Sequence, residues 1–304
     1  MNKVSVIIAN KNTGALLKNS LKNLERIKRH EHEDLEVIVV DRASDDGSAE
    51  MVAKDYPNVI LVETVDKGLS AASNMGAAKA TGDYLLFLAP DAYPRNITIP
   101  KMVAYMEENR DVGLSTPKLY LERGALDHDA HRSFPTPWNS FTRLTGLYSL
   151  FPKSKLFNSY FMWYEDLDKE HEIDACVYGF MLVRKEVFDH IEGFDPAYYA
   201  HGLDLDLCYK IKQAGHKVMY LPKWESGHLK TRIPSKKHKF RLKKEESLGT
   251  RIEFAKSSTQ AMRVFLKKNY SGQYNILLRA FMIIATYLLE VIRTLGAIVK
   301  FIFY

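Results

Sequence analysis

The 304-residue chain is poor in cysteine and shows no internal repeat or low-complexity segment. Cys176 and Cys208 lie in apolar stretches and form no ligand motif, which excludes a disulfide framework and a cysteine-based metal centre. We interpret them as reduced core residues of a cytosolic protein. The apolar run at residues 4–9 is too short for the hydrophobic region of a secretory signal, so we expect a first strand there.

Long uncharged hydrophobic runs are also missing. Residues 276–304 are mostly apolar, but Arg279, Glu290, Arg293 and Lys300 interrupt them. The longest stretch between these charges, 280–289, is shorter than the roughly 20 residues that a membrane span needs. On a helix the four charges fall within a sector about 80° wide. Such a stripe is typical of a helix lying in a bilayer interface, although a helix packed on a catalytic domain or a second subunit would show it too.

The overall composition is that of a globular protein with a basic bias. Hydrophobic residues make up 46% of the chain and charged residues 26%, as in a globular protein with a full core. The length suits one large α/β domain with an appendage, or two small domains. The formal net charge of +6 favours an anionic partner such as a nucleotide, a nucleic acid or a membrane surface. Residues 230–244 are strongly basic and would suit a diphosphate or the phosphates of a lipid-linked molecule, or simply form a solvated face.

Strands and helices alternate along the first part of the chain. The apolar runs "VSVIIA" (4–9), "LEVIVVD" (35–41) and "DYLLFLAPD" (83–91) predict buried strands. Between them, apolar residues recur at helical spacing and predict helices. This order predicts a mainly parallel sheet with helices on both faces. Ligands bind at the carboxyl ends of such strands, where Asp41 and Asp91 both fall. The irregular, aromatic-rich residues 118–174 would form a functional loop or lid.

Further acids and one histidine complete a candidate site. Asp204 and Asp206 open a predicted helix, and His228 follows the last predicted strand. With these residues the sequence resembles glycosyltransferase family 2, the inverting nucleotide-sugar transferases of the GT-A fold. The matching stretches run in the family's order from about residue 4 to 231 and include "VIVVDRASDDGS", "KGLSAASNMGAAKATGDYLLFLAPDA", "LDLDLCYKIKQAGHKVMYLP" and "SGHLKT". The arrangement is most similar to the bacterial rhamnosyltransferases that build polysaccharides on lipid carriers.

The resemblance implies roles for residues near the strand ends. Asp41 would bind the base or ribose of the donor nucleotide, with Asn10 and Asn12 lining the same pocket. Asp91 and His228 would hold Mg²⁺ or Mn²⁺, which can complete their coordination with water and phosphate oxygens. The remaining implied donor contacts are Lys67, Gly68 and Asn74.

Some of these positions have structural alternatives. Lys67 and Arg42 stand where the family often has Asn, and would add positive charge near the diphosphate or simply be exposed. Gly68, Asn74 and Gly76 would serve equally in a helix packed closely on the sheet. Asp91 stands alone at its strand end, with Ala89 where a second acid would be common.

Two stretches compete for the catalytic base. "YEDLD" (164–168), with Asp166, looks more like the family's acidic motif, but "GLDLD" (202–206) has the right position in the chain. We therefore expect Asp204 to be the base, because it aligns with the family's base and the helix N-terminus favours its ionised form. Asp206 diverges by about 200° on the helix and would bond locally. Leu203 replaces the family's Glu, and His201 is close enough to contribute.

These observations predict a GT-A domain (1–231) followed by a basic and amphipathic helical extension (232–304). We expect an inverting, metal-dependent glycosyltransferase at the cytoplasmic face of the membrane. Its partners would be a nucleotide-sugar donor and a glycan or lipid-linked acceptor, with self-association possible and no nucleic-acid motif. A nucleotidyltransferase, or a glycan- or membrane-binding scaffold with a decayed site, are the alternatives.

Overall fold

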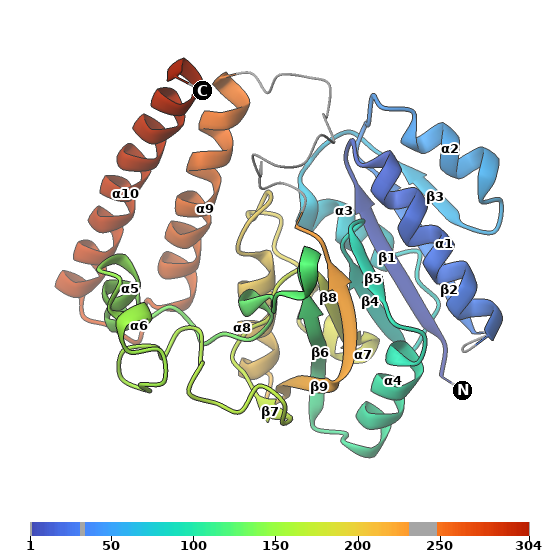
Figure 1. Ribbon diagram of the computed structural model, residues 1–304, viewed down its shortest axis with the longest axis horizontal. Helices are drawn as coiled ribbons and strands as arrows, with labels where there is room; N and C mark the ends of the chain where they lie inside the picture. Colours follow the sequence, from blue (N-terminus) through green and yellow to red (C-terminus); the bar gives the residue numbers. More distant parts are fainter. Residues whose placement is uncertain (1, 31–33, 231–247, 304) are drawn as a thin grey trace. The chain divides into compact units, whose positions relative to one another are not determined.

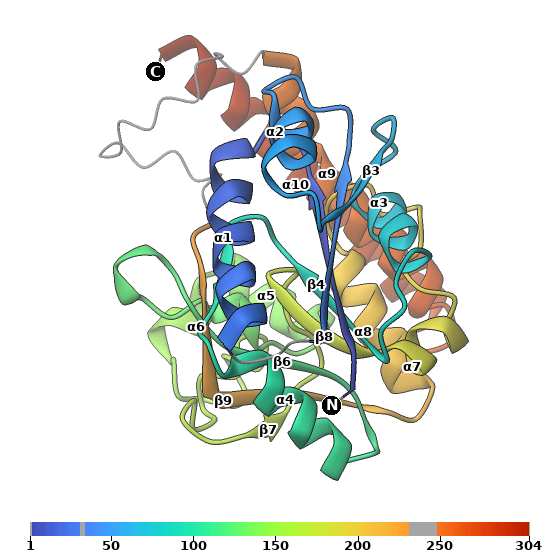
Figure 2. The same ribbon diagram turned by 90° about the vertical axis from the view of Figure 1, so that its right-hand side faces the viewer.

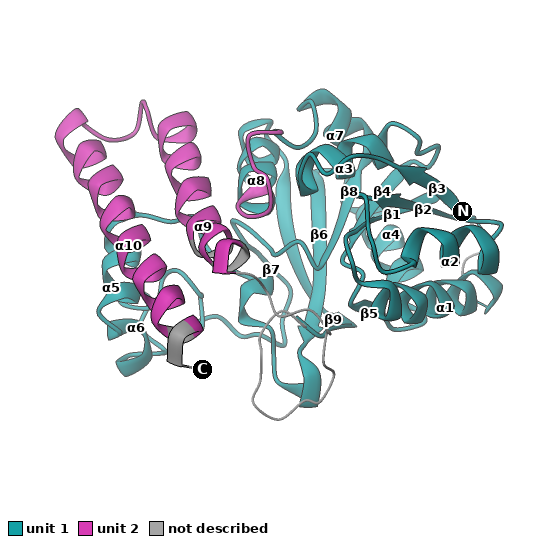
Figure 3. Ribbon diagram, turned by 90° about the horizontal axis from the view of Figure 1, so that it is seen from above, with its two compact units in different colours: residues 1–195, 204–230 teal, residues 196–203, 231–304 magenta. Residues whose placement is uncertain are grey.

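The computed structural model describes residues 2–30, 34–230 and 248–303. The chain divides into two compact units, one of residues 1–195 and 204–230 and the other of residues 196–203 and 231–304 (Figure 3). Apart from Lys230, the basic stretch 230–244 lies outside the described residues. The predicted assignment of a transferase domain to residues 1–231 and of a membrane-associating extension to residues 232–304 stays a prediction.

The first unit is built on one sheet (Figure 1). Among the described residues the strand order is β3-β2-β1-β4-β8-β6-β9-β5, and β7 pairs with β9 outside this path. The strands are β1 (Val4–Asn10), β2 (Leu35–Asp41), β3 (Ile60–Glu63), β4 (Tyr84–Leu88), β5 (Ala92–Pro94), β6 (Val112–Tyr120), β7 (His171–Glu172), β8 (Phe180–Arg184) and β9 (Lys217–His228).

Helices cover both faces of this sheet. Figure 2 shows α1 on one side and α3, α7 and α8 on the other. The α-helices are α1 (Gly14–His30), α2 (Ser48–Asp55), α3 (Leu69–Ala77), α4 (Thr98–Glu108), α5 (Pro137–Leu144), α6 (Leu147–Leu150), α7 (Lys185–His190) and α8 (Leu203–Gln213). Apolar residues explain this packing, because every residue of β1, β4 and β8 is buried.

The sheet is mixed. β1 pairs in parallel with β2 and β4, β2 with β3, and β6 with β9. β8 runs antiparallel to β4 and β6, and β9 is antiparallel to β5 and β7. The predicted α/β fold class is therefore confirmed, with more antiparallel pairing than a mainly parallel sheet would have. The long insertion before β8 allows this reversal, since β4 and β8 need not be joined by a right-handed crossover.

The second unit contains α9 (Leu248–Asn269) and α10 (Ile276–Phe303). Two charges of the stripe on α10 contact α9: Glu290 accepts hydrogen bonds from Arg263 (2.5 Å) and Thr259 (2.9 Å), and Arg293 donates to the Ser258 hydroxyl. Arg279 instead donates to the Ser271 carbonyl, after the end of α9. The outer side of α10 is apolar and exposed, at Ile276, Leu277, Phe281, Ile284, Leu288, Val291, Ile292, Leu295 and Val299.

This arrangement changes how α10 is interpreted. The sequence suggested that the charges leave no stretch long enough to span a bilayer, yet residues 276–299 form 24 helical residues that are apolar enough for a span by length and composition. Because Glu290 and Arg293 contact α9, these two charges do not interrupt the apolar outer side. α10 therefore buries polar groups and exposes apolar ones, the reverse of a water-soluble amphipathic helix.

Candidate active site at the strand ends

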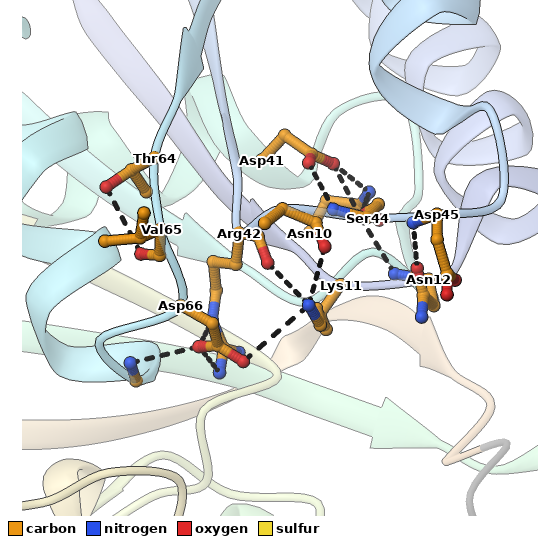
Figure 4. Close-up of polar contacts among 12 residues, drawn as sticks. Asn10, Lys11, Asn12, Asp41, Arg42, Ser44, Asp45, Thr64, Val65 and Asp66 are labelled. Atoms are coloured by element: carbon orange, nitrogen blue, oxygen red, sulfur yellow. Dashed lines mark hydrogen bonds and ion pairs between the residues drawn. The ribbon is translucent and has the colours of Figure 1, made fainter.

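The register of β1 and β2 brings Asn10 and Asp41 side by side at the ends of their strands. The Asn10 amide donates to the buried Asp41 carboxylate (2.8 Å) and to the Ser48 hydroxyl (2.7 Å). Ser44 donates to the same carboxylate from its backbone N–H (2.8 Å) and its hydroxyl (2.7 Å). Asn12 accepts from the Asp45 backbone N–H at 2.8 Å (Figure 4). These predicted residues therefore form one polar network that joins the loops after β1 and β2.

A second polar cluster lies beside this network, around Asp66. Arg42 donates to the Asp66 carboxylate from Nε (2.9 Å) and Nη2 (2.6 Å), and Lys11 Nζ lies 3.9 Å from it (Figure 4). Asp66 also accepts from the backbone N–H of Gly68 at 3.1 Å. The positive charge that the sequence assigns to Arg42 is therefore balanced by a carboxylate, whereas Lys67 is exposed.

Two residues of the glycine-rich segment have clear structural roles. A Cβ at Gly76 would lie 2.5 Å from Ile7 Cγ2, so glycine allows α3 to approach β1 closely. Asn74 donates to the Phe194 carbonyl (2.7 Å) and accepts from the Phe194 backbone N–H (3.0 Å). These contacts explain both residues by packing and turn formation, and a donor contact from Asn74 stays a prediction.

Asp91 and His228 meet where β5 pairs with β9. Ala92 is the register partner of His228, and the Leu229 backbone N–H donates to the Asp91 carbonyl at 3.0 Å. The His228 Nε2 atom lies 3.9 Å from the Asp91 carboxylate. Two predicted ligands that are far apart in the sequence are thus held face to face by strand pairing.

His228 is fixed from two further sides. Its Nδ1 lies 2.9 Å from the buried carboxylate of Asp127, while a Cβ at Gly179 would lie 2.8 Å from two atoms of the imidazole ring. Lys230 donates to Asp127 and Asp129, both at 2.6 Å. Burial would raise the pKa of Asp127, but the hydrogen bonds from His228 and Lys230 and the charge of Lys230 lower that pKa to about 2. Asp127 is therefore an ionised acceptor at neutral pH.

This geometry fits a divalent cation with few protein ligands. In the described part of the chain, no group of three or more His, Cys, Asp or Glu side chains could hold a metal ion. A proton on Nδ1 that is shared with Asp127 would leave the Nε2 lone pair on the side of Asp91, which is the usual way in which a carboxylate orients a histidine ligand. Mg²⁺ and Mn²⁺ take remaining oxygens from water and phosphate.

Asp204 lies at the first turn of α8 and is nearly buried. Its carboxylate accepts from Arg132 Nη2 (2.5 Å) and from the Leu205 backbone N–H (2.9 Å). Although burial opposes it, the Asp204 charge raises the pKa of Arg132 well above its ordinary value. Arg132 thus forms an ion pair with the predicted base and fixes one of its carboxylate oxygens.

The other candidates for the base are placed differently. Asp206 is fully buried in α8. Asp166 is half exposed and pairs with Lys169 at 3.2 Å. His201 belongs to the second unit.

Sequence reasoning missed Asp66, Asp127 and Arg132. Asp127 and Arg132 flank the short 3₁₀ helix His128–Ala130 in the irregular insertion, and they contact His228 and Asp204, respectively. The spacing D-x-D followed by an arginine was the available signal, but acids and arginines in a polar loop are common. The insertion therefore contributes the buried Asp127 and the partly buried Arg132 as partners of two predicted functional residues.

Comparison with known proteins agrees with this fold. The model of the family described as glycosyl transferase family 2 matches residues 5–191. The rhamnosyltransferase WbbL of Escherichia coli is 25% identical over 226 residues, which cover 66% of this chain and 81% of WbbL. The dolichol-phosphate mannosyltransferase of Pyrococcus furiosus is 25% identical over 193 residues, covering 62% of this chain and 48% of that protein.

Two solved structures resemble this chain in fold. The mannosyltransferase PcManGT from Pyrobaculum calidifontis, in complex with GDP-Man and Mn²⁺, has a TM-score of 0.57 at 18% identity, covering 98% of this chain and 74% of that one. GalNAc-T7 with UDP, GalNAc and Mn²⁺ has a TM-score of 0.58 at 18% identity, covering 87% of this chain and 48% of that one. At these identities the likeness concerns the fold.

Proposed function

The chain belongs to glycosyl transferase family 2, and from that premise we propose that it is an inverting, divalent-metal-dependent transferase. It would move a sugar, rhamnose, from a nucleoside-diphosphate donor to a growing, lipid-linked glycan. The observation that carries the proposal is the pairing of Asp91 with His228, whose ring is oriented by Asp127. The pair lies at the carboxyl ends of the strands, where nucleotides bind in α/β folds. The similarity to WbbL supports the choice of sugar.

Binding of the donor is assigned to the strand ends. Asp41, with Asn10 and Asn12 around it, would accept hydrogen bonds from the base or ribose, and Lys67 and Gly68 would face the diphosphate. Asp91 and His228 would hold Mg²⁺ or Mn²⁺. That cation, when bound, would supply positive charge against the diphosphate that leaves the sugar.

Transfer itself is assigned to Asp204. The acceptor hydroxyl attacks the anomeric carbon from the face opposite the diphosphate, a new glycosidic bond forms, the sugar–phosphate bond breaks, and the configuration inverts. Asp204 takes the hydroxyl proton. Arg132 acts as a positioning residue, because its 2.5 Å ion pair fixes one carboxylate oxygen of Asp204 and so orients the group towards the acceptor.

The test is incubation of the full chain with a panel of nucleotide sugars, with Mn²⁺ or with a chelator. We expect one donor to be consumed only with metal and its anomeric configuration to invert in the product, measured by nuclear magnetic resonance. Binding of no donor under either condition would remove the transferase proposal. Release of pyrophosphate from a nucleoside triphosphate would identify a nucleotidyltransferase, and donor or glycan binding without turnover would identify a scaffold.

We also propose that α10 contacts the cytoplasmic face of the membrane. Glu290 and Arg293 of α10 are paired with residues of α9, while the outer side of α10 exposes residues such as Leu277 (80% exposed) and Leu288 (62%). Replacement of both by Gln should weaken binding to vesicles of phosphatidylcholine and phosphatidylglycerol. If binding is unchanged while the oligomeric state falls, α10 is a subunit interface instead.

A further inference from the structure

A segment of the first unit combines exposed apolar side chains with an unusual charge pattern. Residues 130–164 contain no Asp or Glu, although the whole chain has 37, and they include Arg143, Lys153 and Lys155. Helices α5 and α6 lie in this segment, to one side of the sheet (Figures 1 and 3). Any surface that this segment forms by itself therefore carries positive charge without compensating acids.

Helix α5 has its apolar residues on the outside. Its buried residues are the polar Asn139 and Thr142, while Trp138, Phe141 and Leu144 are exposed, Leu144 by 72%. Asn139 and the N-cap Thr136 form a capping box, which fixes the helix by local polar contacts. The helix is thus fixed by local polar contacts, while Trp138, Phe141 and Leu144 stay 44%, 49% and 72% exposed.

Exposed apolar side chains continue in the residues after α5. Leu150 is 71% exposed and Leu156 59%, with Phe151 between them. We define the insertion patch by its exposed apolar and cationic members: Trp138, Phe141, Arg143, Leu144, Leu150, Phe151, Lys153, Lys155 and Leu156. The charges adjoin aromatic rings, since Arg143 lies 5.0 Å from the Tyr160 ring and Lys155 lies 5.7 Å from the Tyr164 ring.

We propose that the insertion patch binds an anionic phospholipid surface, as a second membrane contact separate from α10. Exposed Trp, Phe and Leu residues suit the boundary between headgroups and acyl chains, and the three cations suit acidic headgroups. A second copy of the chain fits less well. In a symmetric contact the same cations of the two copies would face one another and repel, with no acidic residue of the segment to balance them. The inference deepens the proposed membrane association and rests on it.

The experiment measures sedimentation of the full chain with phosphatidylcholine vesicles that contain or lack phosphatidylglycerol. The double variant Leu144→Gln/Leu150→Gln should bind anionic vesicles about tenfold more weakly, because two largely exposed apolar groups are lost from the contact. Lys153→Gln/Lys155→Gln should also weaken binding at least about fivefold, and only when phosphatidylglycerol is present. Ile97→Gln, an exposed apolar residue outside the patch (51%), is the matched control and should bind like the wild type.

The α10 variant Leu277→Gln/Leu288→Gln separates this inference from the proposal on which it rests. If that variant loses binding but the patch variants bind like the wild type, the insertion patch is not a membrane contact and the α10 proposal stands. If all variants keep full binding, both proposals fail. A patch variant that changes oligomeric state and not vesicle binding would make the patch a subunit interface and overturn the inference. The thermal unfolding temperature of each variant is also measured. A value equal to that of the wild type confirms that binding, and not folding, has changed.

Discussion

Asp41 and Asp127 are both buried carboxylates that accept several hydrogen bonds, but the chain positions them in different ways. Asp41 is the last residue of β2, and the parallel register with β1 places it beside Asn10. Asp127 precedes a 3₁₀ helix in an irregular insertion, and its position depends on contacts with His228, the last residue of β9, and with Lys230 just after it. One site is built by regular secondary structure, and the other by contacts between distant segments.

This difference explains which residues a sequence can identify. Strand periodicity and the rule that ligands bind at carboxyl ends locate Asp41 without any tertiary information. The partners of Asp127 lie 101 and 103 residues away in the chain, at His228 and Lys230. The insertion has no repeating apolar pattern to reveal these contacts, although it supplies the partner of both a predicted metal ligand and a predicted base.

The largest effect is expected where the insertion contacts α8. Asp204→Asn should lower the transfer rate by a factor of about 10² to 10⁴, because the amide cannot accept the acceptor's proton. Asp166→Asn, in the competing "YEDLD" stretch, is the matched control and should transfer at the native rate in the same donor assay. The opposite result would move the base to Asp166.

A smaller effect is expected at Asp127. Asp127→Asn should weaken Mn²⁺ binding about 10- to 100-fold in the presence of a nucleoside diphosphate, since the partner that orients His228 loses its charge. Electron paramagnetic resonance of free Mn²⁺ measures this directly. Asp129→Asn, which shares Lys230 with Asp127, should retain metal affinity. Equal losses in both variants would show that the charge of the loop matters more than the orientation of His228.

Asp41→Asn tests the other side of the comparison. It should weaken the binding of a metal-free nucleoside diphosphate about tenfold, measured by calorimetry, because a charged acceptor is removed from the pocket. Asp55→Asn, at an exposed ion pair with Lys18, should have no effect. If Asp127→Asn weakened metal-free nucleotide binding as much as Asp41→Asn, the two carboxylates would not serve separate functions.

The smallest effect is expected in the pH dependence of folding stability, at the buried His131 of the insertion. Burial lowers the pKa of His131 from 6.5 to about 4. The unfolded chain therefore binds more protons between these values, and the stability from neutral His131 is complete above pH 6.5 and is lost as the pH falls towards 4. Between pH 8 and pH 6 the wild type should lose about 1 kcal/mol more than His131→Phe in denaturant unfolding. If the free energy of unfolding changed equally with pH in the two proteins, His131 would not be buried in its neutral form.

Most of the regular fold could be predicted from the sequence. The strands at residues 4–10, 35–41 and 84–88, and the helix that begins at Leu203, follow from apolar runs and helical spacing. The antiparallel direction of β8 could not be predicted, because pairing direction depends on where the insertion returns the chain. The sequence also could not predict which side of α10 is covered. Its periodicity locates a charged stripe, but does not say whether water or α9 contacts that stripe.

The polar seam between α9 and α10 has a consequence for how these helices hold together in different media. In water, a Glu290–Arg263 pair competes with hydration and stabilises the hairpin weakly. Against hydrocarbon, no water would compete from the outer side of α10, and the same pair and the Arg293–Ser258 contact would tie the helices more firmly. The hairpin would thus gain cohesion on leaving water, whereas an ordinary soluble helix pair, held by the hydrophobic effect, would lose it.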